Sequence, residues 1–482
     1  MNTEHLSLLT DLYELSMMQG YFKTGNHDTV VFDAFYRTNP DQGGYAVCAG
    51  LAQIIEYIEH LHFDHSDLAY LKSLGMFEDD FLSYLENFRF SGDIYAIPEG
   101  TVIFPREPLV KVIAPIMEAQ LVETAILNIL NHQSLIATKA ARVCYAAQGD
   151  GVMEFGLRRA QGPDAGVYGA RAAVIGGCCG TSNVLCGKLF NVPVKGTHAH
   201  SWIMSFPDEY TAFKTYAESY PSACILLVDT YDTLKSGIPN AIRVFQELRE
   251  KGVVLKNYGI RMDSGDLAYL SKRARKMLDG AGFQDAIISA SNDLDEYLIE
   301  NLKAQGAAIT SWGVGTNLIT SKNCPAFGGV YKLAAIKNQQ GEFVPKIKLS
   351  ENSEKVTNPG NKTIYRIYEK SSGKIKADLI CLEGETFDCE KDLRIFDPIE
   401  TWKSTSLKGG TYQMRRLPVQ IFDQGRCVYQ SPSVMEMQKY CEQEKNTLWN
   451  ETKRFANPSK VYVDLSDKLF EMKRNILKDF SN

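Results

Sequence analysis

Residues 223–228 read Ala-Cys-Ile-Leu-Leu-Val, a short apolar run that is typical of a strand buried on both faces. Similar runs follow at residues 258–262, 286–289 and 309–313, and successive runs begin 23 to 35 residues apart. Segments with helical spacing of apolar residues separate them, for example residues 267–278. This alternation predicts an α/β fold with a parallel sheet. The sheet could be open and doubly wound or closed, and we expect an irregular, TIM-like α/β barrel.

The pattern of the sequence changes on either side of this region. Residues 1–135 combine helix-like stretches with short strand-like ones, which predicts an N-terminal α+β domain. We expect the α/β barrel to form a catalytic domain over residues 136–345. Residues 346–482 predict β hairpins followed by a charged helical tail. A length of 482 residues is compatible with two or three domains.

Composition narrows the class of protein. Hydrophobic residues make up 44% of the chain and charged residues 23%, which is typical of a globular protein. The net charge of −6 disfavours nucleic acid and anionic membranes as partners, and no apolar run is long enough to span a bilayer. Residues 1–5 do not resemble a secretory signal, and the eleven cysteines form no zinc-like pairs. We therefore expect a cytoplasmic protein with reduced thiols.

Two histidines lie close together where a short strand gives way to a loop. Residues 196–201 read Gly-Thr-His-Ala-His-Ser, which places His198 and His200 two positions apart among small residues. A neutral imidazole is a competent nucleophile or general base near pH 7. The alternative is that both are half-buried loop histidines that bond to backbone groups. The side chains at the neighbouring strand ends favour the reactive interpretation.

Charged side chains and glycines follow the other predicted strands. Asp229 comes directly after Val228, while Arg261 and Asp263 lie two apart on an extended segment and so share one face. The latter two form either a structural ion pair or a site in which Arg261 holds an anion and Asp263 a hydroxyl or hydrated cation. Residues 313–316, Gly-Val-Gly-Thr, form either a tight turn or a phosphate cradle of backbone N–H groups. Because such ends gather at one edge of the sheet, a phosphorylated substrate is favoured.

Seven motifs extend the pattern over the whole chain. They are Thr10-Asp11-Leu12-Tyr13, Phe155-Gly156-Leu157-Arg158-Arg159-Ala160-Gln161, Gly196-Thr197-His198-Ala199-His200-Ser201, Asp229-Thr230-Tyr231-Asp232, Arg261-Met262-Asp263-Ser264-Gly265-Asp266, Gly313-Val314-Gly315-Thr316 and Val330-Tyr331-Lys332-Leu333. In this order they resemble the motifs of the nicotinate phosphoribosyltransferase family. The resemblance implies an irregular α/β barrel, an N-terminal sandwich domain completed by C-terminal strands, and a homodimer with shared active sites.

The resemblance also implies a reaction and its participants. In this family nicotinate displaces pyrophosphate from 5-phosphoribosyl 1-pyrophosphate, which gives nicotinate mononucleotide for NAD biosynthesis. ATP is the implied co-substrate and Mg²⁺ the implied cofactor. The implied catalytic residues are His200, as a phosphohistidine, and Asp263, with Asp229 near the metal. The implied nicotinate-binding residues are Tyr13, Phe155, Arg158, Thr197 and Arg261, and the implied phosphate-binding residues are Gly313, Gly315, Thr316 and Asn292.

The sequence departs from the family pattern at two places. His198 stands where relatives often carry Met or Leu, which leaves a proton-relay role open, and Asn292 stands where the glycine of Ser-Gly-Asp is common. Two other functions compete with the expected one. A sibling enzyme could act on nicotinamide or quinolinate, although the arginines here favour a carboxylate over an amide. A catalytically silent barrel could serve as a binding protein, and pyrophosphate release would distinguish these cases.

Overall fold

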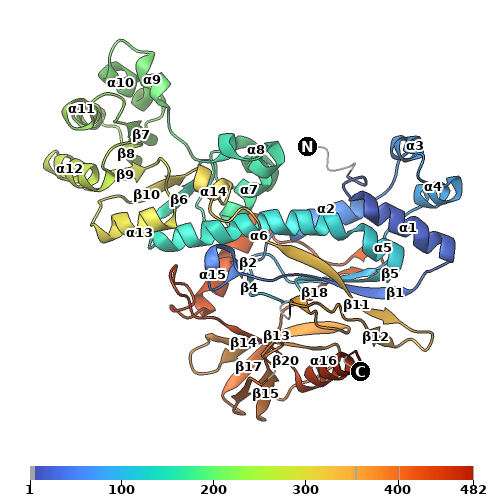
Figure 1. Cartoon of the computed structure of the whole chain (residues 1–482). Coiled ribbons are helices and arrows are strands. Elements are labelled where there is room, and N and C mark those ends of the chain that lie inside the picture. The colour runs from blue at the N-terminus through green and yellow to red at the C-terminus, as the bar shows by residue number, and fades with distance from the viewer. Residues whose placement is uncertain (1–5, 353–354, 401, 481–482) are drawn as a thin grey trace. The chain divides into compact units, whose positions relative to one another are not determined.

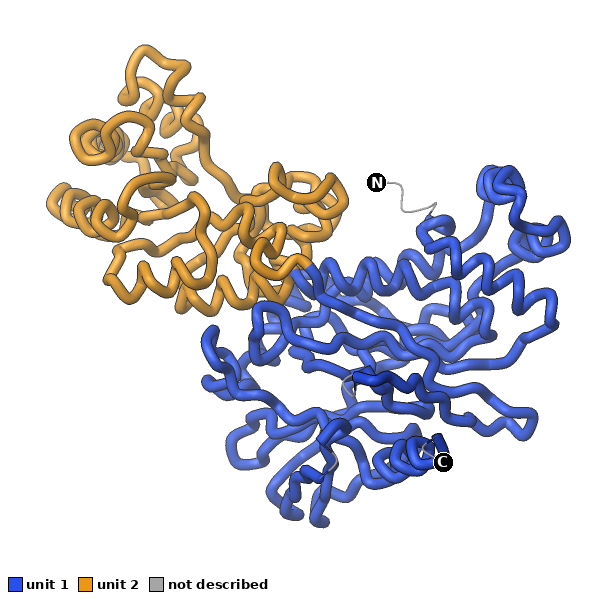
Figure 2. The backbone as a smooth tube through the Cα atoms, in the orientation of Figure 1, with its two compact units in different colours: residues 1–135, 326–482 blue, residues 136–325 orange. Residues whose placement is uncertain are grey.

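The structure, a computed structural model, describes residues 6–352, 355–400 and 402–480. It divides into two compact units (Figure 2), which are residues 1–135 with 326–482 and residues 136–325. Residues 1–5, on which the expected absence of a secretory signal rests, lie outside the described part. Within that part, none of the helices combines the length and the apolar character that crossing a bilayer requires.

A parallel sheet of five strands forms the centre of the second unit (Figure 1). The strand order is β6-β10-β9-β8-β7. Side chains such as Leu226, Ile260 and Ile288 are fully buried, as expected for strands covered on both faces. The strands are β6 (Gly151–Glu154), β7 (Ala223–Leu227), β8 (Asn257–Met262), β9 (Ile287–Ala290) and β10 (Ser311–Val314).

Helices alternate with these strands along the chain. The side chains of Asp266 and Asp295 accept backbone N–H groups at the starts of α12 and α13, as N-caps do. α12 buries Leu267, Ala274 and Leu278 along one face, which accounts for its helical spacing of apolar residues. The helices are α7 (Pro163–Gly176), α8 (Val184–Phe190), α9 (His200–Met204), α10 (Glu209–Ser219), α11 (Ile238–Glu250), α12 (Leu267–Gly280), α13 (Glu296–Ala304) and α14 (Thr316–Ile319).

The expected closed barrel is not shown by the described residues. Beyond β6 the sheet continues only as isolated parallel bridges, from Glu154 to Thr181 and from Thr181 to Val194. The other edge is β7, where Leu227 N–H donates to Nε2 of His198 at 3.3 Å. A side chain rather than a backbone ladder makes this link, so the observed architecture is a mixed α/β fold with a parallel sheet in this unit.

The first unit contains a seven-stranded sheet that joins distant parts of the sequence. Its order is β12-β11-β1-β5-β3-β18-β19, so strands from residues 329–345 and 419–427 flank those of the N-terminal region. The sequence had assigned residues 329–345 to the barrel domain. Its strands are β1 (Thr29–Tyr36), β3 (Asp93–Ala96), β5 (Val110–Pro115), β11 (Gly329–Lys337), β12 (Phe343–Pro345), β18 (Val419–Asp423) and β19 (Arg426–Cys427).

A six-stranded sheet and a short two-stranded one complete this unit. The larger has the order β16-β15-β20-β14-β13-β17, and it consists of β13 (Lys362–Glu369), β14 (Ile375–Leu382), β15 (Leu393–Phe396), β16 (Ser404–Leu407), β17 (Tyr412–Arg416) and β20 (Tyr462–Leu465). β2 (Ala46–Val47) pairs with β4 (Val102–Ile103). The helices are α1 (Leu12–Thr24), α2 (Leu51–His60), α3 (His65–Ser73), α4 (Asp79–Glu86), α5 (Ile116–Leu121), α15 (Val434–Thr447) and α16 (Asp467–Asp479), and α6 (Glu123–Ala146) includes the boundary with the second unit.

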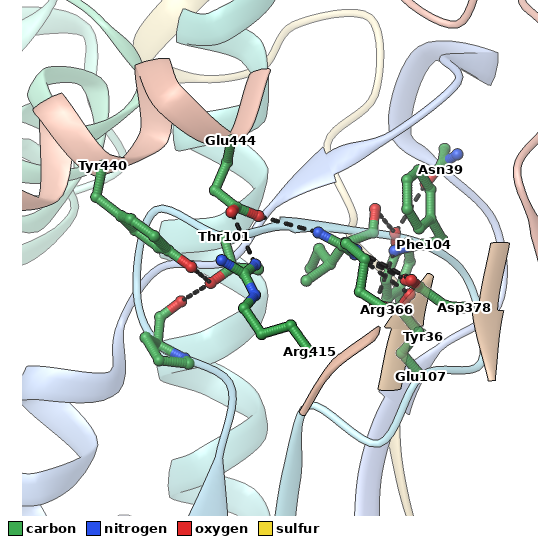
Figure 3. A network of polar contacts seen from close by, with 12 residues as sticks. Tyr36, Asn39, Thr101, Phe104, Glu107, Arg366, Asp378, Arg415, Tyr440 and Glu444 are labelled. Atoms are coloured by element: carbon green, nitrogen blue, oxygen red, sulfur yellow. Dashed lines mark hydrogen bonds and ion pairs between the residues drawn. The ribbon is translucent and has the colours of Figure 1, made fainter. Parts of the chain in front are cut away.

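A buried charge network connects β13, β14 and α15 (Figure 3). Arg366 is fully buried and donates to Asp378 at 2.7 Å and to Glu444 at 3.0 Å. Glu107 lies 3.7 Å from the same guanidinium, and burial raises its pKa well above the ordinary value. Arg415 adds a second cation, 2.8 Å from Glu444. Because each charge in the network has an opposite partner, removal of one would leave another buried and uncompensated.

Candidate functional site at the carboxyl edge of the parallel sheet

The carboxyl ends of the five parallel strands bring most of the expected site residues of the second unit together. Asp229 and Thr230 follow β7, Asp263 follows β8, and Ser291 follows β9. In open α/β sheets, ligands bind outside this edge because side chains from several strand ends converge there. The contacts among these residues define the site.

His200 is the first residue of α9 and reaches two of these strand ends. Its Nδ1 lies 3.0 Å from the hydroxyl of Thr230, and its Nε2 lies 3.9 Å from Oδ2 of Asp263. The side chains of His200 and Asp263 are 39% and 38% exposed, so both are open to a ligand. Because Thr230 occupies Nδ1, Nε2 is the ring nitrogen that is available for chemistry.

Asp263 and Asp229 are held by hydroxyl and backbone donors. Ser291 donates to Oδ1 of Asp263 at 2.5 Å. Oδ2 of Asp229 accepts the N–H of Asp263 at 2.8 Å and the hydroxyl of Ser264 at 2.6 Å. Oδ1 of Asp229 is buried and has no hydrogen-bond partner within the described residues. Oδ1 of Asp229 is therefore an acceptor that is available to a ligand.

Arg261 supplies a cation beside these carboxylates. Its Nη1 donates to Oγ1 of Thr197, while its Nε is buried and makes no hydrogen bond to any described residue. Burial lowers the pKa of Arg261, and the charge of Arg158 lowers it further, whereas Asp263 and Asp229 act in the opposite direction. A guanidinium stays charged under these conditions and would gain from an anionic partner.

Phe155 occupies the space that Gly313 of β10 leaves open. A Cβ atom on Gly313 would lie 2.6 Å from Cδ2 of Phe155, and Phe155 N–H donates to Val314 at 2.8 Å. Gly313 is buried, so its surroundings favour a packing role over direct contact with a phosphate. Gly315 and Thr316 are only half-buried at the start of α14 and retain that candidate role.

Three further expected residues take no part in the hydrogen bonds and packing contacts described above. Arg158 is exposed in a short 3-10 helix, Leu157–Arg159, and Asn292 is exposed directly after Ser291. Asn292 has φ of 102°, a backbone region that favours glycine. Tyr13 belongs to the first unit, where it lies on α1 and is 46% exposed.

Sequence reasoning missed several residues that shape the site. Thr230 and Ser264 stand inside motifs that the sequence singled out, but only their carboxylate neighbours received roles. Ser291 lies two positions after the predicted strand at residues 286–289 and directly after β9, so its position near a strand end was a usable signal. Glu154 is fully buried and accepts from Thr181 Oγ1 at 2.6 Å and from Gly156 N–H, contacts that fix the start of the Phe155 loop.

The fold and site define an α/β protein with carboxylates, hydroxyls and a buried cation gathered at the carboxyl edge of its parallel sheet. Residues 8–131, 151–369 and 361–473 match, respectively, the N-terminal domain, the family region and the C-terminal domain of nicotinate phosphoribosyltransferase (NAPRTase). The chain is 49% identical over 465 residues to nicotinate phosphoribosyltransferase of Bacillus subtilis, covering 96% of this chain and 94% of that protein. It is 31% identical over 520 residues to the Homo sapiens protein of the same name, covering 96% and 95%. The chain therefore belongs to the nicotinate phosphoribosyltransferase family.

Solved structures show the same relationship. The crystal structure of human nicotinic acid phosphoribosyltransferase is 28% identical in sequence, with a TM-score of 0.84 over 97% of this chain and 99% of that one. Nicotinate-nucleotide pyrophosphorylase from Pyrococcus furiosus has a TM-score of 0.70 over 93% and 97%, at 22% identity. The second similarity is one of fold alone.

Proposed function

We propose that this protein transfers the phosphoribosyl group of 5-phosphoribosyl 1-pyrophosphate to nicotinate, releasing pyrophosphate and forming nicotinate mononucleotide for NAD biosynthesis. The observation that carries the proposal is the buried Nε of Arg261, a charged donor without a described partner. An anionic carboxylate on a flat ring pairs with such a donor through opposite charge as well as a hydrogen bond, whereas a neutral amide offers only its carbonyl oxygen. Phe155 and Tyr13 are the proposed stacking residues, with Arg158 and Thr197 as further contacts of the base.

The remaining site residues suit the charge changes of the transfer. As the C1–O bond breaks, positive charge grows on the ribose and negative charge on the leaving group. Asp263 and Asp229 supply fixed negative charge, and Asp263 is the proposed acceptor of ribose hydroxyls. The half-buried Gly315 and Thr316 are the proposed contacts of the substrate phosphates. Asn292, which follows Ser291 in the sequence, is a further proposed contact of the phosphates. Gly313 supports Phe155.

ATP coupling through His200 is part of the proposal. Nε2 of His200 would accept the γ-phosphoryl group of ATP, releasing ADP, and water would later cleave the N–P bond to give phosphate. Two observations support this role: the ring is 39% exposed, and Thr230 binds Nδ1 and leaves Nε2, which lies 3.9 Å from Asp263, for the phosphoryl group. The overall reaction is therefore ligase-type as well as a transfer.

Mg²⁺ fits this site only if the phosphates of the substrate and water supply most of its ligands. The described residues contain no group of three or more His, Cys, Asp or Glu side chains that could hold a metal. Asp229 offers one oxygen, Oδ1, and Mg²⁺ commonly takes one or two carboxylates together with phosphates and water. When bound, it would neutralise the charge that develops on pyrophosphate.

We also propose a cytoplasmic homodimer with shared active sites, in which Tyr13 completes the base site of the partner subunit. The exposure of Tyr13 on α1 supports a contact with the partner subunit. Mixing of Tyr13→Ala and His200→Ala subunits tests this arrangement, because one intact site should return in each mixed dimer. ATP-coupled activity equal to the mean of the two parents, despite proven mixed dimers, would contradict shared sites.

The test of the proposed reaction is a full product balance. Purified protein with nicotinate, 5-phosphoribosyl 1-pyrophosphate, ATP and Mg²⁺ should form nicotinate mononucleotide and pyrophosphate in equal amounts, with ADP and phosphate when ATP is present. Transfer without ATP should be slower. Binding of the substrates without release of pyrophosphate would instead indicate a silent binding protein.

A further inference from the structure

His198 lies between two proposed site residues, and the proposed reaction gives it no role. The segment that contains it begins at a bond to a neighbouring segment, in which Lys195 N–H donates to Thr181 at 2.9 Å, and ends in the first turn of α9, in which Trp202 N–H donates to Ala199 at 3.0 Å. Between these points the backbone must place Thr197 against Arg261 and His200 against Thr230.

The ring of His198 makes a specific contact with the sheet. Its Nε2 accepts the N–H of Leu227 at 3.3 Å, and its ring packs edge-on against Tyr216 with 4.6 Å between centroids. Leu227 is the last residue of β7, an edge strand whose outward N–H groups have no neighbouring strand to bond. The bond therefore ties the His200 segment to the strand end that leads, three residues later, to Thr230.

The protonation state of His198 favours an acceptor over a proton relay. The residue is 8% exposed, and burial lowers its pKa to about 4. A neutral ring has a lone pair on one nitrogen, and the contact with Leu227 requires it on Nε2, with the proton on Nδ1. A relay needs a ring that gains and loses a proton near neutral pH, and a buried nitrogen that is already occupied by a backbone N–H does not meet that need.

We propose that His198 is a positioning residue, whose Nε2 accepts the Leu227 N–H and thereby holds His200 in register with Thr230 and Asp263. The inference deepens, and rests on, the proposed phosphorylation of His200. It assigns a function to the position where this sequence departs from the Met or Leu of many relatives.

Amide side chains provide a matched test, because glutamine can place an acceptor near the position of Nε2 whereas asparagine is too short to reach it. The measurement is the rate of phosphoryl transfer from γ-labelled ATP to the protein, with the labelled residue mapped, for the native protein and for His198→Gln, His198→Asn and His198→Leu. Melting temperatures confirm that each variant is folded. The KM for 5-phosphoribosyl 1-pyrophosphate is recorded in parallel.

We expect His198→Gln to label His200 at close to the native rate and His198→Asn and His198→Leu to be slower by about tenfold, or about 1.4 kcal/mol. The KM for 5-phosphoribosyl 1-pyrophosphate should stay unchanged in all three. If asparagine supports labelling as well as glutamine, or glutamine is as slow as leucine, the positioning role is wrong. Absence of label on His200 in the native protein would instead overturn the phosphohistidine proposal itself, and label on His198 would overturn both.

Discussion

Replacement of Arg261 by glutamine tests the proposed base site at its buried, unpartnered donor. The substitution removes the charge and the unpartnered Nε while leaving a polar side chain near Thr197. A hydrogen bond to a charged group contributes about 1.5–3 kcal/mol. At about 1.4 kcal/mol per factor of ten, this loss corresponds to roughly a 10- to 150-fold weaker interaction with nicotinate.

The assay is steady-state kinetics with each substrate varied in turn. We expect Arg261→Gln to raise the KM for nicotinate by that factor and to change the KM for 5-phosphoribosyl 1-pyrophosphate little. Arg261→Lys is the matched control, because it keeps the charge but lacks the planar fork, so its effect should be intermediate. Arg261 also interacts with the charges of Asp263 and Asp229, which raise its pKa. Equal losses for both substrates, together with a lower melting temperature, would show a structural ion pair and refute the base-site role.

Four further outcomes follow from the structure. His200→Ala should abolish ATP hydrolysis and leave slow, ATP-independent transfer, and unchanged ATP consumption would contradict its role. Arg158→Gln should raise the KM for nicotinate, whereas Arg159→Gln, its exposed neighbour in the same 3-10 helix, should not. Asp378→Asn should lower the free energy of unfolding in urea by about 3–5 kcal/mol, because fully buried Arg366 loses its closest carboxylate. Burial raises the pKa of Glu14 from 4.5 to about 7, so its ionisation opposes folding; stability should fall as pH rises through about 7, and Glu14→Gln should remove that fall in urea titrations at several pH values.

Local sequence patterns predicted much of the second unit. The expected strand at residues 223–228 is β7, Ala223–Leu227, and the expected helix at residues 267–278 is α12, Leu267–Gly280. Both predictions are confirmed because a strand buried on two faces and a helix buried along one face each have a characteristic order of apolar residues. Closure of the sheet has no such pattern in the sequence. It depends on how the segment from Thr181 to His198 pairs, and here that pairing consists of single bridges and a side-chain bond.

Site residues at strand ends could be predicted from the sequence, whereas those whose role depends on packing between strands could not. Asp229, Arg261 and Asp263 could be placed together because carboxyl ends of parallel strands converge. The contact between Phe155 and Gly313 joins residues far apart in sequence, and a glycine that makes room for an aromatic ring looks like one that cradles a phosphate. The same limit applies to Arg366, whose partners come from separate strands and a helix.

The central claim is that the cationic base site selects a carboxylate. Its most direct test is the ratio of kcat/KM for nicotinate to kcat/KM for nicotinamide, measured on the purified native protein at saturating 5-phosphoribosyl 1-pyrophosphate and ATP. A site whose buried guanidinium would lose its anionic partner and keep only a neutral carbonyl should prefer nicotinate by a factor on the order of a hundred. Equal values for the two bases, or a preference for nicotinamide, would contradict the account.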